Sequence, residues 1–183
     1  LTIGKDALTV LTLGSVVDYR DGWAGYTQAG LDLSVGLPGM LGAMDEDGDG
    51  QSSRTSASGA KAGGDFSKIN VNLTRVQPLL FSPALKNSSL LARVQFQSSS
   101  DLLVSLEQMS LGGPNSVRAY PPAEFMVDTG YFVSLELIAK SSSTVQGIFL
   151  ENLQLSAFYD YAAGELNDPL ANDVASPMIQ GIG

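Results

Sequence analysis

The sequence of 183 residues contains neither cysteine nor histidine. Without cysteine there can be no disulfide, no thiolate metal site and no cysteine nucleophile. Without histidine the chain lacks the commonest general base and the commonest zinc ligand. A phosphate-binding loop is missing as well. We therefore expect no enzyme activity, no cofactor and no bound nucleotide.

Positive charge is also scarce, since 10 lysines and arginines face 19 aspartates and glutamates, for a net charge of −9. Nucleic-acid binding needs an excess of lysine and arginine, so no nucleic-acid partner is expected. Residues 1–183 show no signal-peptide pattern and no apolar run of about 18 residues, the length of a membrane-spanning helix, so we expect no transmembrane helix among them. Because the chain begins and ends inside patterned segments, we interpret residues 1–183 as a piece of a longer chain.

The dominant pattern in the sequence is an alternation of apolar and polar residues. In one segment, for example, Ile69, Val71 and Leu73 alternate with Asn70 and Asn72. Segments of roughly 10–15 residues with this period are long enough to cross a bilayer as tilted strands. The sequence contains six of them, at residues 6–20, 26–37, 66–77, 89–98, 129–140 and 147–162.

Alternation is compatible with two architectures, a soluble antiparallel sandwich and a transmembrane barrel. Sandwich strands usually run about 5–6 residues, which is shorter than these segments. Short links alternate with the long loops 38–65, 101–128 and 163–177, as in outer-membrane barrels. Aromatic residues also lie near the predicted strand ends. We predict that residues 1–183 are part of one all-β, antiparallel transmembrane barrel domain, and a soluble β-sandwich binding module is the alternative.

The loop 101–128 contains the most distinctive local sequence of the chain. Gly112 and Gly113 open a Gly-Gly-Pro-Asn run that requires a tight, unusual backbone path. The following residues are Val117, Arg118, Ala119 and Tyr120, and Arg118 carries the only charge of this tip. On the polar face of segment 147–162, Asp160 follows Phe158 and Tyr159. Arginine prefers a planar carboxylate partner, so a pair between Arg118 and Asp160 is one hypothesis; two separately hydrated side chains are the other.

An acidic stretch in the loop 38–65 resembles the beginning of a calcium-binding loop. Asp45, Asp47 and Asp49 stand where the first three EF-hand ligands would be. The twelfth position is Ser56, which cannot bind calcium through two carboxylate oxygens, and no helix pattern flanks the stretch. We expect a solvated acidic loop and no metal centre, with a weak cation site as the alternative.

Two motifs together resemble a known family. Residues 110–120 read Ser-Leu-Gly-Gly-Pro-Asn-Ser-Val-Arg-Ala-Tyr and resemble the Val-Arg-Gly-Tyr region in the sixth extracellular loop of two-partner secretion transporters. This is the hemolysin-activator, ShlB/FhaC-type family, which is related to the BamA-type assembly barrels. Residues 128–137 are similar to the strand that follows this loop, and residues 158–162 resemble the family's Phe-x-Asp-x-Gly motif on the next strand. Ala119 and Ala162 replace the usual glycines.

The resemblance implies an outer-membrane barrel of about 16 strands in a Gram-negative bacterium, preceded by POTRA domains that this chain does not contain. It implies a pore in the lipid bilayer that secretes a large hemolysin- or adhesin-type polypeptide from the periplasm to the cell surface. Arg118 and Asp160 would latch the loop 101–128 inside the lumen. An assembly barrel that inserts other outer-membrane proteins is the alternative. The predicted lumen-lining side chains are Asn70, Asn72, Arg93, Gln95, Gln97, Glu136, Asn152 and Gln154.

Overall fold

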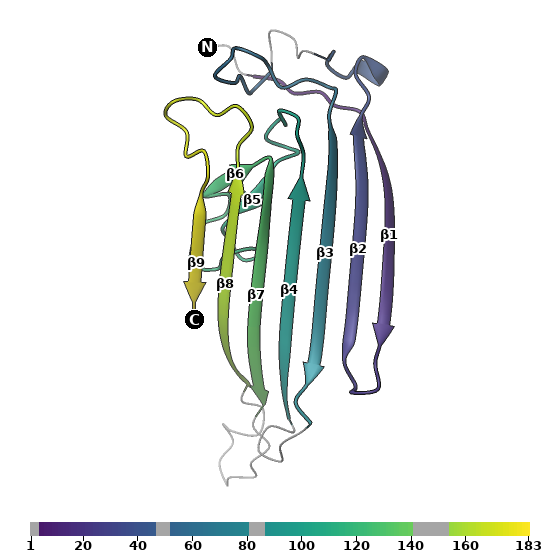
Figure 1. Ribbon diagram of the computed structural model, residues 1–183, viewed down its shortest axis with the longest axis vertical. Helices are drawn as coiled ribbons and strands as arrows, with labels where there is room; N and C mark the ends of the chain where they lie inside the picture. Colours follow the sequence, from purple (N-terminus) through teal and green to yellow (C-terminus); the bar gives the residue numbers. More distant parts are fainter. Residues whose placement is uncertain (1–3, 47–51, 81–86, 141–153) are drawn as a thin grey trace.

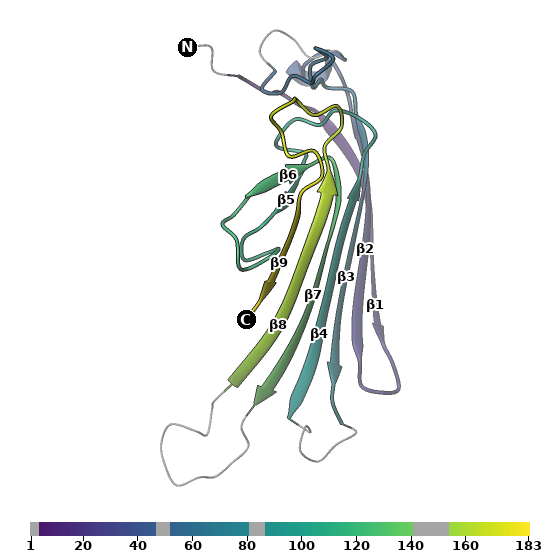
Figure 2. The same ribbon diagram turned by 60° about the vertical axis from the view of Figure 1, so that its left-hand side comes forward.

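The computed structural model describes residues 4–46, 52–80, 87–140 and 154–183. Among these residues, seven strands form one antiparallel sheet in the order β1-β2-β3-β4-β7-β8-β9. Figure 1 shows this sheet as a single tall layer, and Figure 2 shows that it curves along its length. The strands are β1 (Val10–Arg20), β2 (Tyr26–Gly36), β3 (Ser67–Pro78), β4 (Ser88–Ser98), β7 (Thr129–Lys140), β8 (Gln154–Glu165) and β9 (Met178–Ile182).

The six predicted strands are all present, and the all-β antiparallel prediction is confirmed. The prediction of six strands is too low, because β9 adds a seventh to the sheet. The loop 101–128 also contains a small hairpin of β5 (Met109–Leu111) and β6 (Phe125–Val127). Strands this short show too little alternation to be recognised in a sequence. The last strand of the prediction continues to Glu165, so the third long loop begins at 166; residues 147–153 lie outside the described residues.

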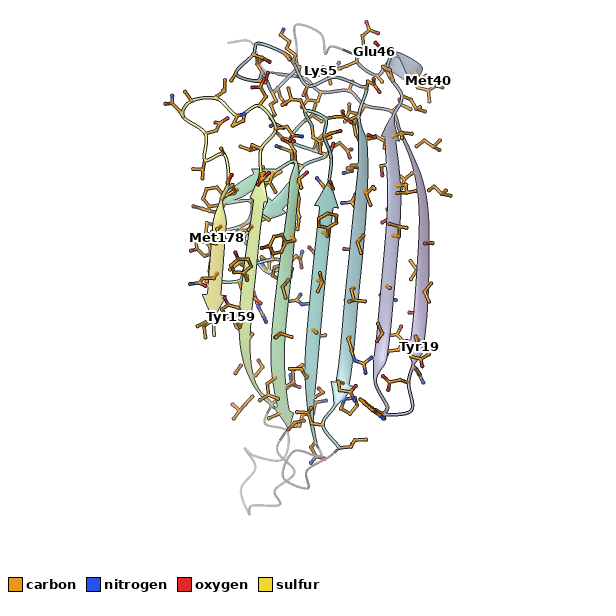
Figure 3. All side chains as sticks on the ribbon, viewed as in Figure 1. Lys5, Tyr19, Met40, Glu46, Tyr159 and Met178 are labelled. Atoms are coloured by element: carbon orange, nitrogen blue, oxygen red, sulfur yellow. The ribbon has the colours of Figure 1, made fainter. Side chains whose placement is uncertain are left out.

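One face of the sheet is apolar and uncovered. The register places Leu73 between Ala29 of β2 and Val94 of β4, so that the apolar rows of neighbouring strands line up. No second sheet covers this face in the part of the chain that the structure describes, unlike in a sandwich. Figure 3 shows the side chains along the strands. Large exposed residues on this apolar face include Leu11, Leu13, Val17, Tyr19, Leu31, Leu33, Val35, Ile69, Leu73, Phe96, Tyr131, Leu135, Leu137, Leu155, Tyr159, Met178 and Ile182.

The two ends of the sheet differ. The links between β2 and β3, between β4 and β7, and between β8 and β9 gather at one end, which we call the loop end (Figure 1). The opposite end, which we call the turn end, carries the turn between β1 and β2, closed by a hydrogen bond of 3.0 Å from the Asp21 amide to the Gly25 carbonyl. The first long loop contains the 3-10 turn η1 (Met40–Gly42). No helix in the described ranges is long and apolar enough to cross a membrane.

The opposite face of the sheet, the polar face, carries the folded segment 99–128. Figure 2 shows this segment, with β5 and β6, on one side of the curved sheet. Its Leu111, Val117 and Val127 pack against side chains of β7, β8 and β9 in a buried apolar cluster. Burial of a Val or Leu side chain contributes about 1.5–3 kcal/mol. The strand residues of this cluster are Phe132, Ala162 and Ile179.

Candidate functional site

Two glycines shape the tip of the segment 99–128. Gly112 and Gly113 have φ angles of 100° and 93°, in the region that favours glycine. A side-chain carbon on Gly112 would lie 2.5 Å from the Pro121 carbonyl oxygen, so the backbone leaves no room for one. The Gly113 amide donates to the Tyr120 carbonyl at 3.0 Å and closes the tip. This closed turn buries Val117 and directs Arg118 toward the sheet.

Arg118 meets Asp160 in a forked ion pair. Arg118 Nε donates to Asp160 Oδ2 at 2.8 Å, and Nη2 donates to Oδ1 at 3.0 Å. The backbone amide of Arg118 also donates to Oδ2, at 3.1 Å. Asp160 is fully buried on the polar face of β8. Paired guanidinium and carboxylate groups in this arrangement are strong and directional, so the contact fixes both the position and the orientation of the loop tip.

Further groups on β7 and β8 complete the surroundings of the guanidinium. Arg118 Nη1 donates to Glu136 Oε2 at 2.6 Å, and Nη2 donates to Ser134 Oγ at 3.3 Å. The guanidinium carbon lies 3.5 Å from the centroid of the Phe158 ring, within the range of a cation–π contact. Sequence reasoning placed Glu136 only on the pore lining and did not pair it with Arg118. The register explains the contact, because Glu136 lies opposite Phe158, two residues before Asp160.

Arg93 of β4 lies beside this site. It is opposite Ser134 in the register, and its Nη2 donates to Ser134 Oγ at 3.4 Å. The guanidinium carbon of Arg93 is 5.6 Å from the Phe132 ring centroid. Its Nε is buried and has no hydrogen-bond partner. Ser134 therefore contacts both arginines, one from the sheet and one from the loop.

The other predicted lining residues fall on the same face, except where they lie outside the described part. Gln97 is buried under the segment 99–128 and accepts a hydrogen bond of 2.8 Å from Asn70. Asn72 and Gln95 are opposite each other on β3 and β4. Asn152 lies outside the described residues. Apart from Asn152, strand alternation and register place all the predicted lining residues on the polar face with Asp160: Asn70, Asn72, Arg93, Gln95, Gln97, Glu136 and Gln154.

The alanines at the two positions where glycine is usual fit the local structure. Ala119 has a negative φ angle, which alanine adopts without strain. Its methyl group faces Gly181 of β9, where an added side-chain carbon would lie only 2.8 Å away. Ala162 is fully buried in the apolar cluster under the loop. Both alanines are therefore packed into the interface between the loop tip and the sheet.

Sequence reasoning missed a second buried ion pair, between Arg54 and Asp128. Asp128 is fully buried, and Arg54 donates to its two oxygens at 2.5 and 2.7 Å. The two residues are 74 positions apart and belong to no motif. Of the acidic stretch expected to be a solvated loop, with a weak cation site as the alternative, Asp47 and Asp49 lie outside the described residues. Within those residues no group of three or more histidine, cysteine or acidic side chains could hold a metal ion.

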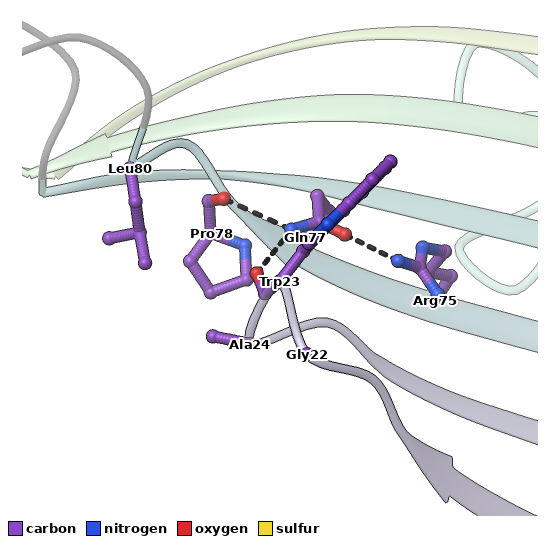
Figure 4. Close-up of a pocket in the computed structure, with 7 residues that line it drawn as sticks. All are labelled: Gly22, Trp23, Ala24, Arg75, Gln77, Pro78 and Leu80. Carbon is purple, nitrogen blue, oxygen red and sulfur yellow. Dashed lines mark hydrogen bonds between the residues drawn. The ribbon is translucent and has the colours of Figure 1, made fainter.

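A pocket of about 710 Å³ lies at the turn end, away from Arg118 (Figure 4). Trp23, Pro78 and Leu80 form much of its wall. Gln77 Nε2 donates to the Trp23 carbonyl at 2.9 Å, and Arg75 donates to both Gln77 and Asp21. The pocket shares no residue with the Arg118 site. Its tryptophan beside an arginine is a composition typical of membrane interfaces.

Together, the exposed apolar face and the polar face with its tethered loop define a portion of a transmembrane β-barrel. The family described as "Haemolysin secretion/activation protein ShlB/FhaC/HecB" matches residues 1–176, and the chain belongs to this family. The family consists of two-partner secretion transporters of the Gram-negative outer membrane.

A solved structure supports the fold. The chain is similar to CdiB from Escherichia coli, with a TM-score of 0.68 and 20% sequence identity. The match covers 98% of this chain and 30% of CdiB, so the chain spans less than a third of the length of that protein. No curated protein matches the sequence.

Proposed function

We propose that this chain forms part of an outer-membrane pore that secretes a large hemolysin- or adhesin-type polypeptide from the periplasm to the cell surface. The observation that carries the proposal is the segment 99–128, which packs on the polar face of a sheet whose other face is apolar and exposed. In this proposal the apolar face contacts lipid and the polar face lines the lumen. The long loops then lie on the cell surface, and the exported polypeptide is the partner.

Arg118 acts in this proposal as the latch that holds the loop against the lumen wall. Asp160 is fully buried, and a carboxylate in that position needs a cation. Loss of Arg118 would leave Asp160 unpaired, which costs about 3–5 kcal/mol when a buried pair is broken. Glu136 adds a second acceptor for the same guanidinium. The loop therefore keeps one fixed position over β7 to β9 and over the loop end of β3 and β4. The rest of the polar face, on β1 to β4, stays available to the passing chain.

The exposed part of this wall suits an extended polypeptide in transit. Asn72 and Gln95, which face each other across β3 and β4, each offer both donors and acceptors. Side chains of this type form hydrogen bonds with a passing backbone that water can replace at little cost. Such a wall keeps the lumen hydrated and guides the polypeptide without binding it tightly.

The latch is tested by secretion from cells that carry the full-length transporter. Arg118→Glu places a third acid beside Asp160 and Glu136, so secretion of the partner should fall to a small fraction of the wild-type rate. Adding Asp160→Arg to this variant reverses the pair and should restore part of the rate. Arg75→Ala is the matched control, because it removes another arginine–carboxylate pair at the turn end. Secretion by Arg118→Ala at the wild-type rate would contradict the latch.

The same variants distinguish export from assembly of other outer-membrane proteins. An export pore with a broken latch loses its secreted partner while the levels of other outer-membrane proteins stay normal. An assembly barrel with the same defect lowers those levels. Quantitative immunoblots of the outer membrane alongside the secretion assay therefore separate the two functions.

A further inference from the structure

The carboxylate of Asp128 lies at the loop end of the sheet, directly before β7, and takes no part in the Arg118 site. It is fully buried. Arg54 donates to both of its oxygens at 2.5 and 2.7 Å, and the backbone amides of Leu103 and Asn167 donate at 3.2 and 2.7 Å. The side chain of Gln108 adds a bond of 3.3 Å. A carboxylate bonded in this way is a fixed anchor rather than a solvated charge.

The donors to Asp128 come from three loops that are distant in sequence. Arg54 belongs to the loop between β2 and β3, Leu103 and Gln108 to the segment after β4, and Asn167 to the loop between β8 and β9. Arg54 also donates to the carbonyls of Leu103 at 2.7 Å and Asn167 at 3.1 Å. We call these five residues the loop clasp. Each of the three loops is thus joined to the other two through one buried charge pair.

The clasp is continuous with the polar face of the sheet. Gln97, which lies on that face of β4, donates to the Asp128 carbonyl at 3.2 Å. Asn167 reaches back to the carbonyls of Ser99 and Asp101, at 3.0 and 2.8 Å. A small apolar cluster of Met44, Ala62 and Val104 packs the first loop against the second. The clasp therefore closes the loops over the same face that the Arg118 loop occupies.

We propose that the loop clasp is an outer gate, closed while the pore is idle and opened when a polypeptide emerges between the three loops. This inference rests on the proposed function, because a gate has meaning only in a pore. Neither charge of the pair is stable when buried alone, so a half-opened clasp is unfavourable. The loops then have two favourable arrangements, one fully bonded and one in which both charges reach water. Such bistable contacts convert local changes into opening and closing.

Ion conductance of the full-length transporter in planar lipid bilayers tests the gate without any secreted partner. Arg54→Ala and Asp128→Asn each break the pair, and the open probability should rise on the order of tenfold. Arg54→Lys keeps the charge but loses the fork, and should give an intermediate value. Arg75→Ala, which breaks the ion pair with Asp21 at the turn end, should leave the conductance unchanged. Equal open probabilities for wild type and Arg54→Ala would overturn the gate.

A disulfide lock tests the same gate in a chain whose clasp is intact. The Ala57 amide donates to the Asp168 carbonyl at 3.2 Å, so these two backbones lie close enough for a disulfide between the first and third loops. The chain has no cysteine of its own to interfere. The double variant Ala57→Cys/Asp168→Cys should lose secretion when oxidised and regain it when reduced. Each single variant is the control.

The two experiments separate failure of the gate from failure of the proposed function. If the double-cysteine variant secretes as fast when its disulfide is formed as when the disulfide is reduced, the gate is refuted while the pore remains an exporter. A wild-type transporter that secretes no polypeptide, but whose conductance rises with Arg54→Ala, would refute the export function while the gate stands. The conductance measurement also identifies misfolded variants, because a misfolded transporter forms no channel and gives no current, whether the gate is open or closed.

Discussion

At the scale of single residues, one arginine organises the candidate site. The pairing of Arg118 with Asp160 could be anticipated only from the resemblance of two short motifs, since spacing alone also fits two hydrated side chains. The contacts of Arg118 with Glu136, Ser134 and Phe158 could not be anticipated from the sequence, because they depend on the register of β7 and β8. The alternating pattern fixes which face of a strand each residue occupies, but it leaves open which residues of two neighbouring strands lie opposite each other.

The glycines of the tip give a prediction at this scale. Gly113→Ala forces a side chain onto a φ angle of 93° and should destabilise the tip by about 1–2 kcal/mol. The loop should then be cleaved faster by added protease in intact cells, and secretion should fall. Gly22→Ala is the matched control, since no atom lies within 4 Å of its added carbon. Equal cleavage of the two variants would show that the tip does not depend on the glycine.

At the scale of elements, the long strands were predictable and the short ones were not. β7 has the predicted bounds of 129–140, because Tyr131, Val133, Leu135 and Leu137 mark its apolar face along most of its length. The first strand begins at Val10 instead of residue 6, since the alternating pattern continues beyond the paired backbone. β5, β6 and β9 contain three to five residues each and could not be distinguished from loop sequence.

Adjacent positions on β3 test which face contacts lipid. Leu73→Arg places a charge on the apolar face and should destabilise the inserted barrel by about 2–4 kcal/mol near the bilayer midplane. Asn72→Arg changes the neighbouring residue on the polar face and should be tolerated. Urea unfolding of the full-length protein in lipid vesicles measures both. A larger loss of unfolding free energy in Asn72→Arg than in Leu73→Arg would reverse the assignment of the two faces.

At the scale of the whole molecule, the loops are joined by contacts that no local pattern predicts. Arg54 and Asp128 are both ordinary loop residues in the sequence, and only the folded sheet brings their loops together. The alternation of short and long links did predict that the long loops share one end. Their arrangement over the polar face depends on partly buried polar partners scattered across more than a hundred residues, such as Arg54 and Asn167.

The contact between the first and third loops should depend on pH. Hydrogen bonds from the Ser58 and Ser56 side chains and the Ser58 amide hold the pKa of Asp168 below its ordinary value. Because the folded pKa is lowered, this contribution to stability is present above the unfolded pKa and is lost as the pH falls through the folded pKa, below about pH 4. Hydrogen exchange of the Ala57 and Ser58 amides, corrected for intrinsic rates, should accelerate there. Asp168→Asn should abolish the transition, and an unchanged profile in that variant would contradict this cause.

The outermost strands of the sheet have a consequence for how such a protein enters a membrane. In the described residues, β1 and β9 each have a neighbouring strand on one side only. Backbone amides and carbonyls left without partners in hydrocarbon cost several kcal/mol each. A sheet with two unpaired edge strands therefore has its highest free energy when it is partly inserted. Barrel closure and entry into lipid must then proceed together, so that further strands pair with both edges before hydrocarbon contacts them.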